Sequence, residues 1–238
     1  QVKDRTTLTK IRFFGSRESL LDRSQILLQA DRGPKEPLEN SVTDSLIESA
    51  LSNISDSCAL VISDYDKGVV SNVGAQALIE TANEKGIPVI VDPKLTGLEK
   101  SRGATVVIFE KRGMSLLSRR IGLDDNDAAQ RLLKEYSWEG ILVLGGIHGI
   151  HLHQKDHDSI FMPCMAPSAD QQIGMHDAAA TSLAAALGSG LGLFDAALLA
   201  SAACDCVLSA SSGRDYIDRA TLGLWLDELS WQMRISNR

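Results

Sequence analysis

The four residues Gly174-Met175-His176-Asp177 open an alanine-rich helical segment and combine the groups that phosphate chemistry needs. Backbone N–H groups at the start of a helix point toward an anion, and glycine allows a tight turn beside it. A carboxylate in the same turn can accept the proton of a hydroxyl that attacks phosphorus. These residues therefore predict an anion hole at Gly174, Met175 and His176, with Asp177 as general base. A simple helix N-cap at Asp177 remains the alternative, since Asp is a favoured cap residue.

Asp64 and Asp92 each follow a short apolar run typical of a strand, and a lysine comes soon after each, at Lys67 and Lys94. In open α/β sheets, ligands bind outside the carboxyl ends of the strands, so polar residues there are candidates for a site. The four side chains are thus candidate contacts for an anionic substrate. The alternative is that both aspartates cap turns and both lysines are solvated.

Gly146 and Gly149 follow another strand-like run, within Gly145-Gly146-Ile147-His148-Gly149. Glycines after a strand allow a tight turn and a close approach of backbone to ligand. A G-x-x-G pattern by itself is more often a hairpin turn, so both interpretations stay open here.

Taken in order, the segments D-Y-x-K-G, V-D-P-K, G-x-x-G and G-x-x-D resemble those of the PfkB/ribokinase family of carbohydrate kinases. They are most similar to the heptose-7-phosphate kinase type. The resemblance implies a ribokinase-like three-layer α/β/α fold with a mainly parallel sheet, and phosphoryl transfer from ATP with Mg²⁺ to a phosphorylated sugar. It also implies these roles: Asp177 as base, Gly174, Met175 and His176 as anion hole, Asp64, Lys67, Asp92 and Lys94 for substrate or phosphate, and Gly146, Gly149 and Glu110 for the nucleotide.

The sequence departs from the family pattern at several of these places. Met175 and His176 replace the small residues of G-A-G-D, and Leu144 replaces a hydroxyl residue before the glycine turn. The stretch beginning at Glu110 lacks the asparagine and the glutamate three residues later that organise Mg²⁺ and phosphates. Gln171, next to Asp170, stands where the family has an acidic residue linked to a monovalent cation.

The resemblance further implies that the first part of the family domain lies outside this sequence. Three interpretations follow: an ATP-dependent sugar kinase, a catalytically inactive pseudokinase that serves as a binding or structural subunit, or a kinase whose sugar-binding part comes from another chain. A homodimer or a partner protein could cover the apolar edges that a shortened sheet exposes.

The order of elements predicts how these residues are positioned. Two β-like stretches, residues 8–14 and 25–30, precede a polar segment at 31–40, so residues 1–35 are expected to form a small β lid or dimer clasp and 36–238 the core. Short continuous apolar strands separated by helices indicate a parallel sheet covered on both faces. Strands are predicted at 59–62, 87–91, 104–109 and 141–144, a hairpin at 149–154 and 159–163, and helices at 41–54, 72–85, 124–136, 177–187, 193–209 and 220–233.

Composition limits the classes of partner. The formal net charge of −7 disfavours nucleic acid and anionic membranes, and no apolar run reaches the roughly 18 residues of a membrane span. The four cysteines lack metal-type C-x-x-C spacing, which favours a reducing, cytoplasmic location, with a processed organellar protein as the alternative. His151 and His153 share one strand face and could bind zinc, but surface histidines are the commoner explanation, so no metal site is expected.

Overall fold

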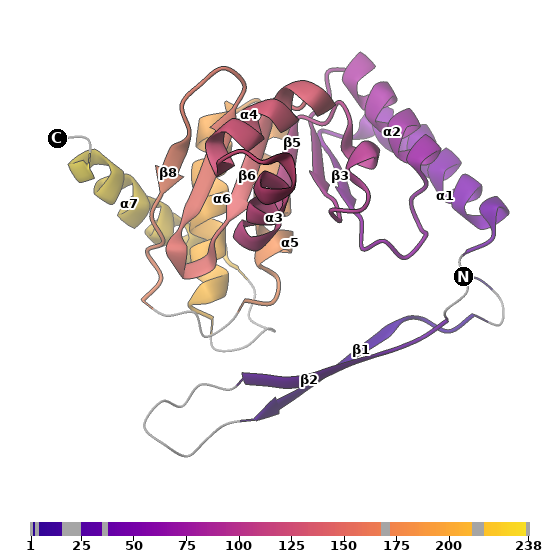
Figure 1. Ribbon diagram of the computed structural model, residues 1–238, viewed down its shortest axis with the longest axis horizontal. Helices are drawn as coiled ribbons and strands as arrows, with labels where there is room; N and C mark the ends of the chain where they lie inside the picture. The colour runs from indigo at the N-terminus through magenta and orange to yellow at the C-terminus, as the bar shows by residue number, and fades with distance from the viewer. Residues whose placement is uncertain are drawn as a thin grey trace.

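The computed structural model describes residues 2, 5–15, 25–34, 38–167, 172–210 and 217–236. Its strands form a six-stranded sheet of order β3-β4-β5-β6-β7-β8 and a separate hairpin of β1 and β2, which extends away from the sheet in Figure 1. The strands are β1 (Thr9–Gly15), β2 (Gln25–Arg32), β3 (Leu60–Ser63), β4 (Val89–Asp92), β5 (Val106–Glu110), β6 (Gly140–Leu144), β7 (Ile150–Gln154) and β8 (Ile160–Met162).

Strands β3 to β6 pair in parallel, and β7 and β8 add an antiparallel edge. Successive side chains of a strand point to opposite faces, and in β4, β5 and β6 both faces are buried. In β4, for example, Val89 and Val91 join one hydrophobic core while Ile90 joins the other. Burial on both faces explains why the strands are continuous apolar runs rather than alternating ones.

Helices cover both faces of the sheet and complete three layers. Helices α1 to α4 pack on one face and α5 to α7 on the other; in Figure 1, α3 and α4 lie in front of the sheet and α6 behind it. The helices are α1 (Asn40–Asn53), α2 (Asn72–Glu84), α3 (Lys111–Ile121), α4 (Asp125–Tyr136), α5 (Met175–Gly188), α6 (Leu193–Leu208) and α7 (Arg219–Ser236).

The fold predicted from the sequence is confirmed, with one omission. No helix was predicted directly after β5, yet α3 occupies residues Lys111–Ile121. Its Arg, Lys, Leu and Met residues favour a helix, but Gly113 near its start disfavours one. However, Met114 and Leu117 are buried three residues apart, so packing of this narrow apolar face against the sheet stabilises the helix.

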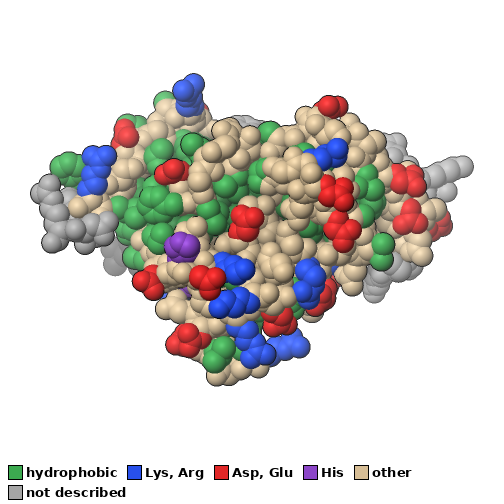
Figure 2. All heavy atoms as spheres, turned by 90° about the horizontal axis from the view of Figure 1, so that it is seen from above, with side chains coloured by type: hydrophobic (Ala, Val, Ile, Leu, Met, Phe, Trp, Pro, Cys, Tyr) green, Lys and Arg blue, Asp and Glu red, His purple; other side chains and the backbone are tan. Residues whose placement is uncertain are grey.

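The surface of the described residues carries both acidic and basic side chains (Figure 2). Acidic and basic side chains are interspersed on the part of the face in Figure 2 that the structure describes, while hydrophobic side chains gather toward its upper left. Among the described residues, no helix is both long and apolar enough to cross a bilayer. The division at residue 35 and the cytoplasmic location stay predictions.

Candidate active site

The start of α5 has the backbone geometry of an anion-binding turn. Gly174 precedes the helix with a φ of 95°, a left-handed conformation that favours glycine. Its carbonyl accepts the amide of Ala178 at 2.8 Å. The amide of Met175, predicted to belong to the anion hole, instead donates to the carbonyl of Gln172 at 3.3 Å within the turn. The side chain of Met175 is buried in the core between α5 and the sheet. The methionine therefore leaves the turn open, although it is bulkier than the residue that the family pattern has there.

His176 points toward the ends of two neighbouring parallel strands. Its Nδ1 lies 3.1 Å from Oδ2 of Asp92, the last residue of β4, and its Nε2 lies 3.6 Å from Oε1 of Glu110, the last residue of β5. Burial is the largest influence on the histidine and lowers its pKa. The hydrogen bond to Asp92 and the charges of Asp92 and Glu110 outweigh burial, so the pKa of His176 is raised above its ordinary value.

These residues line a cavity of about 840 Å³, the polar pocket, at the carboxyl ends of the strands. Seven predicted site residues line it, namely Lys67, Asp92, Lys94, Glu110, Gly174, His176 and Asp177. The other charged residues of its described lining were not predicted from the sequence; they are Lys10 and Arg12 of β1 and Arg112 of α3. Five Lys or Arg side chains thus face three carboxylates, which suits an anionic ligand.

Tyr65 connects the hairpin to this pocket. The ammonium groups of Lys10 and Lys94 lie 5.1 Å and 5.2 Å from the centre of its ring, one from β1 and one from the segment after β4. Cations at this distance from an aromatic face are attracted to it. The tyrosine therefore positions a lysine of the hairpin beside a lysine of the core, a contact that sequence spacing does not reveal.

Asp64 has a different environment from the other predicted contacts. Its side chain is buried, its Oδ2 lies 2.7 Å from Nζ of Lys100, and its Oδ1 accepts the amide of Asp66 at 2.9 Å. Asp64 is absent from the described lining of the polar pocket. These contacts make it a residue that orders the turn after β3, and a direct contact with substrate stays a prediction.

The glycine turn after β6 is tightly packed. The amide of Gly145 donates to the carbonyl of Gly149 at 2.9 Å. A Cβ at Gly149 would lie 2.4 Å from the carbonyl oxygen of Met162, so packing against β8 already requires glycine there. Gly146 has a φ of 59° and open space beside it. Neither Gly146 nor Gly149 is among the described residues that line the polar pocket, and their role in nucleotide binding stays a prediction.

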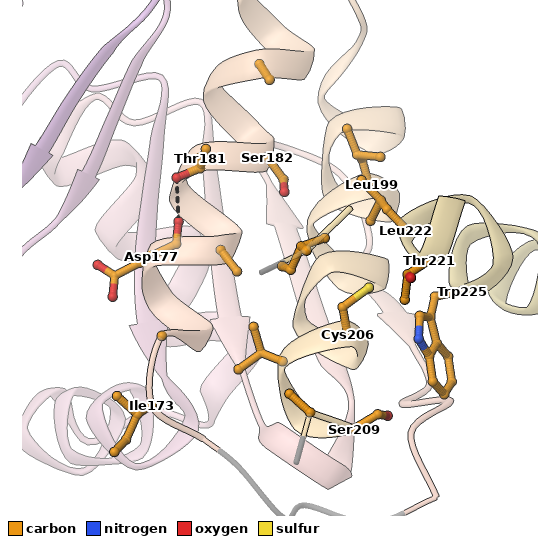
Figure 3. Close-up of a pocket in the computed structure, with 16 residues that line it drawn as sticks. Ile173, Asp177, Thr181, Ser182, Leu199, Cys206, Ser209, Thr221, Leu222 and Trp225 are labelled. Carbon is orange, nitrogen blue, oxygen red and sulfur yellow. Dashed lines mark hydrogen bonds between the residues drawn. The ribbon is translucent and has the colours of Figure 1, made fainter. Parts of the chain in front are cut away.

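A second cavity of about 780 Å³, the apolar cavity, lies between α5, α6 and α7 (Figure 3). Trp225 of α7 forms one wall of this cavity. The polar groups that line the cavity are mainly hydroxyls, such as those of Thr181 and Thr221. The two cavities meet at Ile173, Gly174 and Asp177, which line both. In Figure 3 the carboxylate of Asp177 points away from Trp225, so its oxygens lie on the far side of α5 from this wall.

No metal ligands are assigned in this arrangement. Among the described residues, no three His, Cys, Asp or Glu side chains are grouped so as to hold a metal ion, and we assign no ligands for Mg²⁺ or zinc. The rings of His151 and His153 stack with centres 6.2 Å apart. The expectation of surface histidines is wrong for His153, which is buried because its side chain faces the core. Gln171 and Asp170, the candidates for a monovalent-cation contact, lie outside the described residues.

The sheet topology, the two helical layers and a glycine turn that leads into α5 define a ribokinase-like α/β fold. Solved sugar kinases share it. Phosphofructokinase-2 of Escherichia coli in complex with potassium superposes with a TM-score of 0.68 and 19% identity, over 84% of this chain and 67% of that one. Ribokinase of Thermotoga maritima superposes with a TM-score of 0.67 and 18% identity, over 93% and 71%.

The sequence relatives are bifunctional HldE proteins, which confirms the resemblance to the PfkB/ribokinase family of carbohydrate kinases. The protein of Shewanella piezotolerans is 28% identical over 223 residues, or 93% of this chain and 44% of that one. The protein of Coxiella burnetii is 30% identical over 210 residues, or 87% and 42%. The chain thus spans less than half the length of these relatives. No protein-family model matches it.

Proposed function

We propose that this chain is a carbohydrate kinase that transfers a phosphoryl group from ATP to a hydroxyl of a phosphorylated sugar, of the heptose phosphate type. The observation that carries the proposal is the position of Asp177. Its carboxylate lies at the start of α5, beside the turn at Gly174 and at the edge of a pocket lined by five Lys or Arg side chains. General base, anion-binding amides and anion-attracting cations are thereby collected in one place.

In the proposed reaction Asp177 accepts the proton of the acceptor hydroxyl. The hydroxyl oxygen then forms a bond to the γ-phosphorus while the bond from that phosphorus to the oxygen of the leaving ADP breaks. Backbone N–H groups at the start of α5 steady the transferring group, and Lys67 and Lys94 steady the phosphate that the sugar already carries. Mg²⁺ would arrive bound to the phosphates of ATP. Positioning and neutralisation of charge supply most of the catalysis in such chemistry.

The side chains of the hairpin of β1 and β2 support two roles for it, covering the sugar and pairing two copies of the chain. Lys10 and Arg12 line the polar pocket, while Phe13 and its cross-strand partner Leu28 are 50% and 58% exposed. Exposed apolar patches of this kind mark interaction surfaces. Sedimentation should therefore give a dimer, and Phe13→Lys should give a monomer. The control Val73→Lys, at an exposed position of α2, should leave the dimer unchanged. A monomeric wild type would refute the pairing.

A catalytically inactive pseudokinase is the second candidate, and the environment of Asp92 and Glu110 favours it. In this chain, the ring of His176 lies between these carboxylates and takes up room beside the amides that a transferring phosphate would have to approach. Calorimetry with ATP and Mg²⁺ separates the candidates, because a sugar kinase must bind nucleotide. ³¹P NMR of the protein with ATP, Mg²⁺ and heptose 7-phosphate then tests transfer; binding without a new phosphate ester would favour the pseudokinase.

A further inference from the structure

The two ring nitrogens of His176 both face carboxylate oxygens. Nδ1 lies 3.1 Å from Asp92 and Nε2 lies 3.6 Å from Glu110; Nε2 is also buried and has no hydrogen-bond partner among the described residues. An ionised carboxylate only accepts hydrogen bonds, whereas a neutral imidazole has one donor and one acceptor nitrogen. In the neutral ring, one nitrogen lone pair would therefore face a carboxylate. Only the doubly protonated ring can donate toward both neighbours.

From this arrangement we infer that His176 is a positioning residue that acts as an internal cation. Its imidazolium holds Asp92 and Glu110 on either side of the start of α5, and anion binding at the adjacent amides is coupled to its protonation. The inference rests on the proposed function in one respect, that the start of α5 receives an anion. It goes beyond that function by adding a proton-dependent control that the resemblance does not imply.

The surrounding charges set the direction of this coupling. When His176 loses its proton, the negative charges of Asp92 and Glu110 are no longer neutralised locally, and they repel an anion at the neighbouring amides. The side chain of Glu110 is 66% exposed and can then turn toward water. The other charged or titratable groups that face the same pocket are Lys10, Arg12, Tyr65, Lys67, Lys94, Arg112 and Asp177.

Burial and, to a smaller extent, Lys94 oppose the protonation of His176, and the two carboxylates favour it. The carboxylates prevail, since the pKa of the histidine is raised. Coupling between two binding events is reciprocal, so an anion that binds more tightly to the protonated form must also raise the pKa of His176. Because of this reciprocity, the same coupling can be measured in two ways, through the affinity for the anion and through the pKa of His176.

Sulfate is a suitable probe because its charge stays constant between pH 6 and pH 8.5, whereas phosphate itself titrates in that range. At constant ionic strength, binding followed by NMR should weaken on the order of tenfold from pH 6 to pH 8.5, a typical magnitude for such coupling. Saturating sulfate should raise the pKa of His176, followed through its ring ¹⁵N and ¹³C signals. At pH 6 without sulfate, both ring nitrogens should carry a proton in the wild type.

Three variants sharpen the test. His176→Gln should bind sulfate as weakly at pH 6 as wild type does at pH 8.5, without dependence on pH. His176→Lys should restore tight binding and also remove the dependence on pH. The matched control is His157→Gln, an exposed histidine in the turn between β7 and β8, which should keep the wild-type pH profile.

The proposal is wrong if sulfate fails to bind, if its binding does not change with pH, if His176→Gln retains the wild-type profile, or if the wild-type ring is neutral at pH 6. None of these measurements needs turnover. A protein that shows the coupling but transfers no phosphoryl group would sustain this inference and refute the proposed function. A protein that transfers the phosphoryl group although the ring of His176 is neutral at pH 6 would sustain the proposed function and refute this inference.

Discussion

Asp64 and Lys100 form an ion pair of 2.7 Å with side chains that are only 4% and 12% exposed. The aspartate follows β3, and its amide donates to the carbonyl of Asp92 at 3.1 Å, while the lysine belongs to the short helix Leu98–Ser101 after β4. The pair therefore joins two turns at the edge of the sheet where the polar pocket lies. Neither motif spacing nor composition indicates that these two residues meet.

Replacing one member of this pair should destabilise the fold strongly. Asp64→Ala leaves the largely buried ammonium of Lys100 with only the exposed carboxylate of Asp66, 3.9 Å away, and loss of one partner of a buried pair costs about 3–5 kcal/mol of unfolding free energy. Urea denaturation measures the change. The matched control is Glu99→Ala, which breaks an exposed pair with Arg102 and should cost at most about 1 kcal/mol. Equal effects of the two variants would show that burial of the pair contributes nothing.

Asp177→Asn should abolish phosphoryl transfer while the protein stays folded. The amide cannot accept the hydroxyl proton, and such groups contribute about 10²–10⁴-fold to a rate. The control is Asp195→Asn, the same change in the exposed first turn of α6, which should leave the rate unaltered. Circular dichroism checks folding, and ³¹P NMR checks transfer. A kinase that retains full activity in Asp177→Asn would rule out this residue as the base.

His153 should make the fold sensitive to acid. Burial is the main cause that lowers the pKa of His153 to about 4, with the neighbouring His151 acting in the same direction. The unfolded chain then binds this proton more readily than the native one, so stability falls as the pH drops from about 6.5 toward 4. The loss amounts to about 3 kcal/mol at 1.36 kcal/mol for each pKa unit.

Thermal or urea unfolding at a series of pH values tests this expectation against two variants. His153→Phe keeps a ring of similar size and should flatten the decline between pH 6.5 and 4. His157→Gln alters an exposed histidine nearby and should leave the decline unchanged. An identical decline in wild type and His153→Phe would assign the acid sensitivity to other groups.

Helix α7 should contribute to stability through one face only. Leu229 is fully buried in the core that α5 and α6 share, so Leu229→Ala should cost about 2–5 kcal/mol. Leu224, on the same helix, is 71% exposed, and Leu224→Ala should change stability by less than about 0.5 kcal/mol. Denaturant midpoints compare the two. A small effect at Leu229 would mean that α7 packs only loosely on the core.

Local patterns were sufficient for most of the elements because the parallel strands β4, β5 and β6 are buried on both faces and must be apolar. The same patterns missed α3, where Gly113 interrupts a stretch of Arg, Lys, Leu and Met that otherwise favours a helix. For the site, the residues at strand ends and at the start of α5 were predicted, since topology brings such positions to one edge of a sheet. Lys10, Arg12 and Arg112 were missed, because their segments carry no motif.

The sequence alone determined the type of fold and the order of the polar segments, because hydrophobic periodicity and glycine turns are local properties of the chain. Only the tertiary structure decided how the side chains of those segments are used. It buries Met175 in the core, pairs Asp64 with Lys100, and places His176 between Asp92 and Glu110, 84 residues and 66 residues away along the chain. Contacts over such separations depend on how the layers pack, which no local pattern encodes.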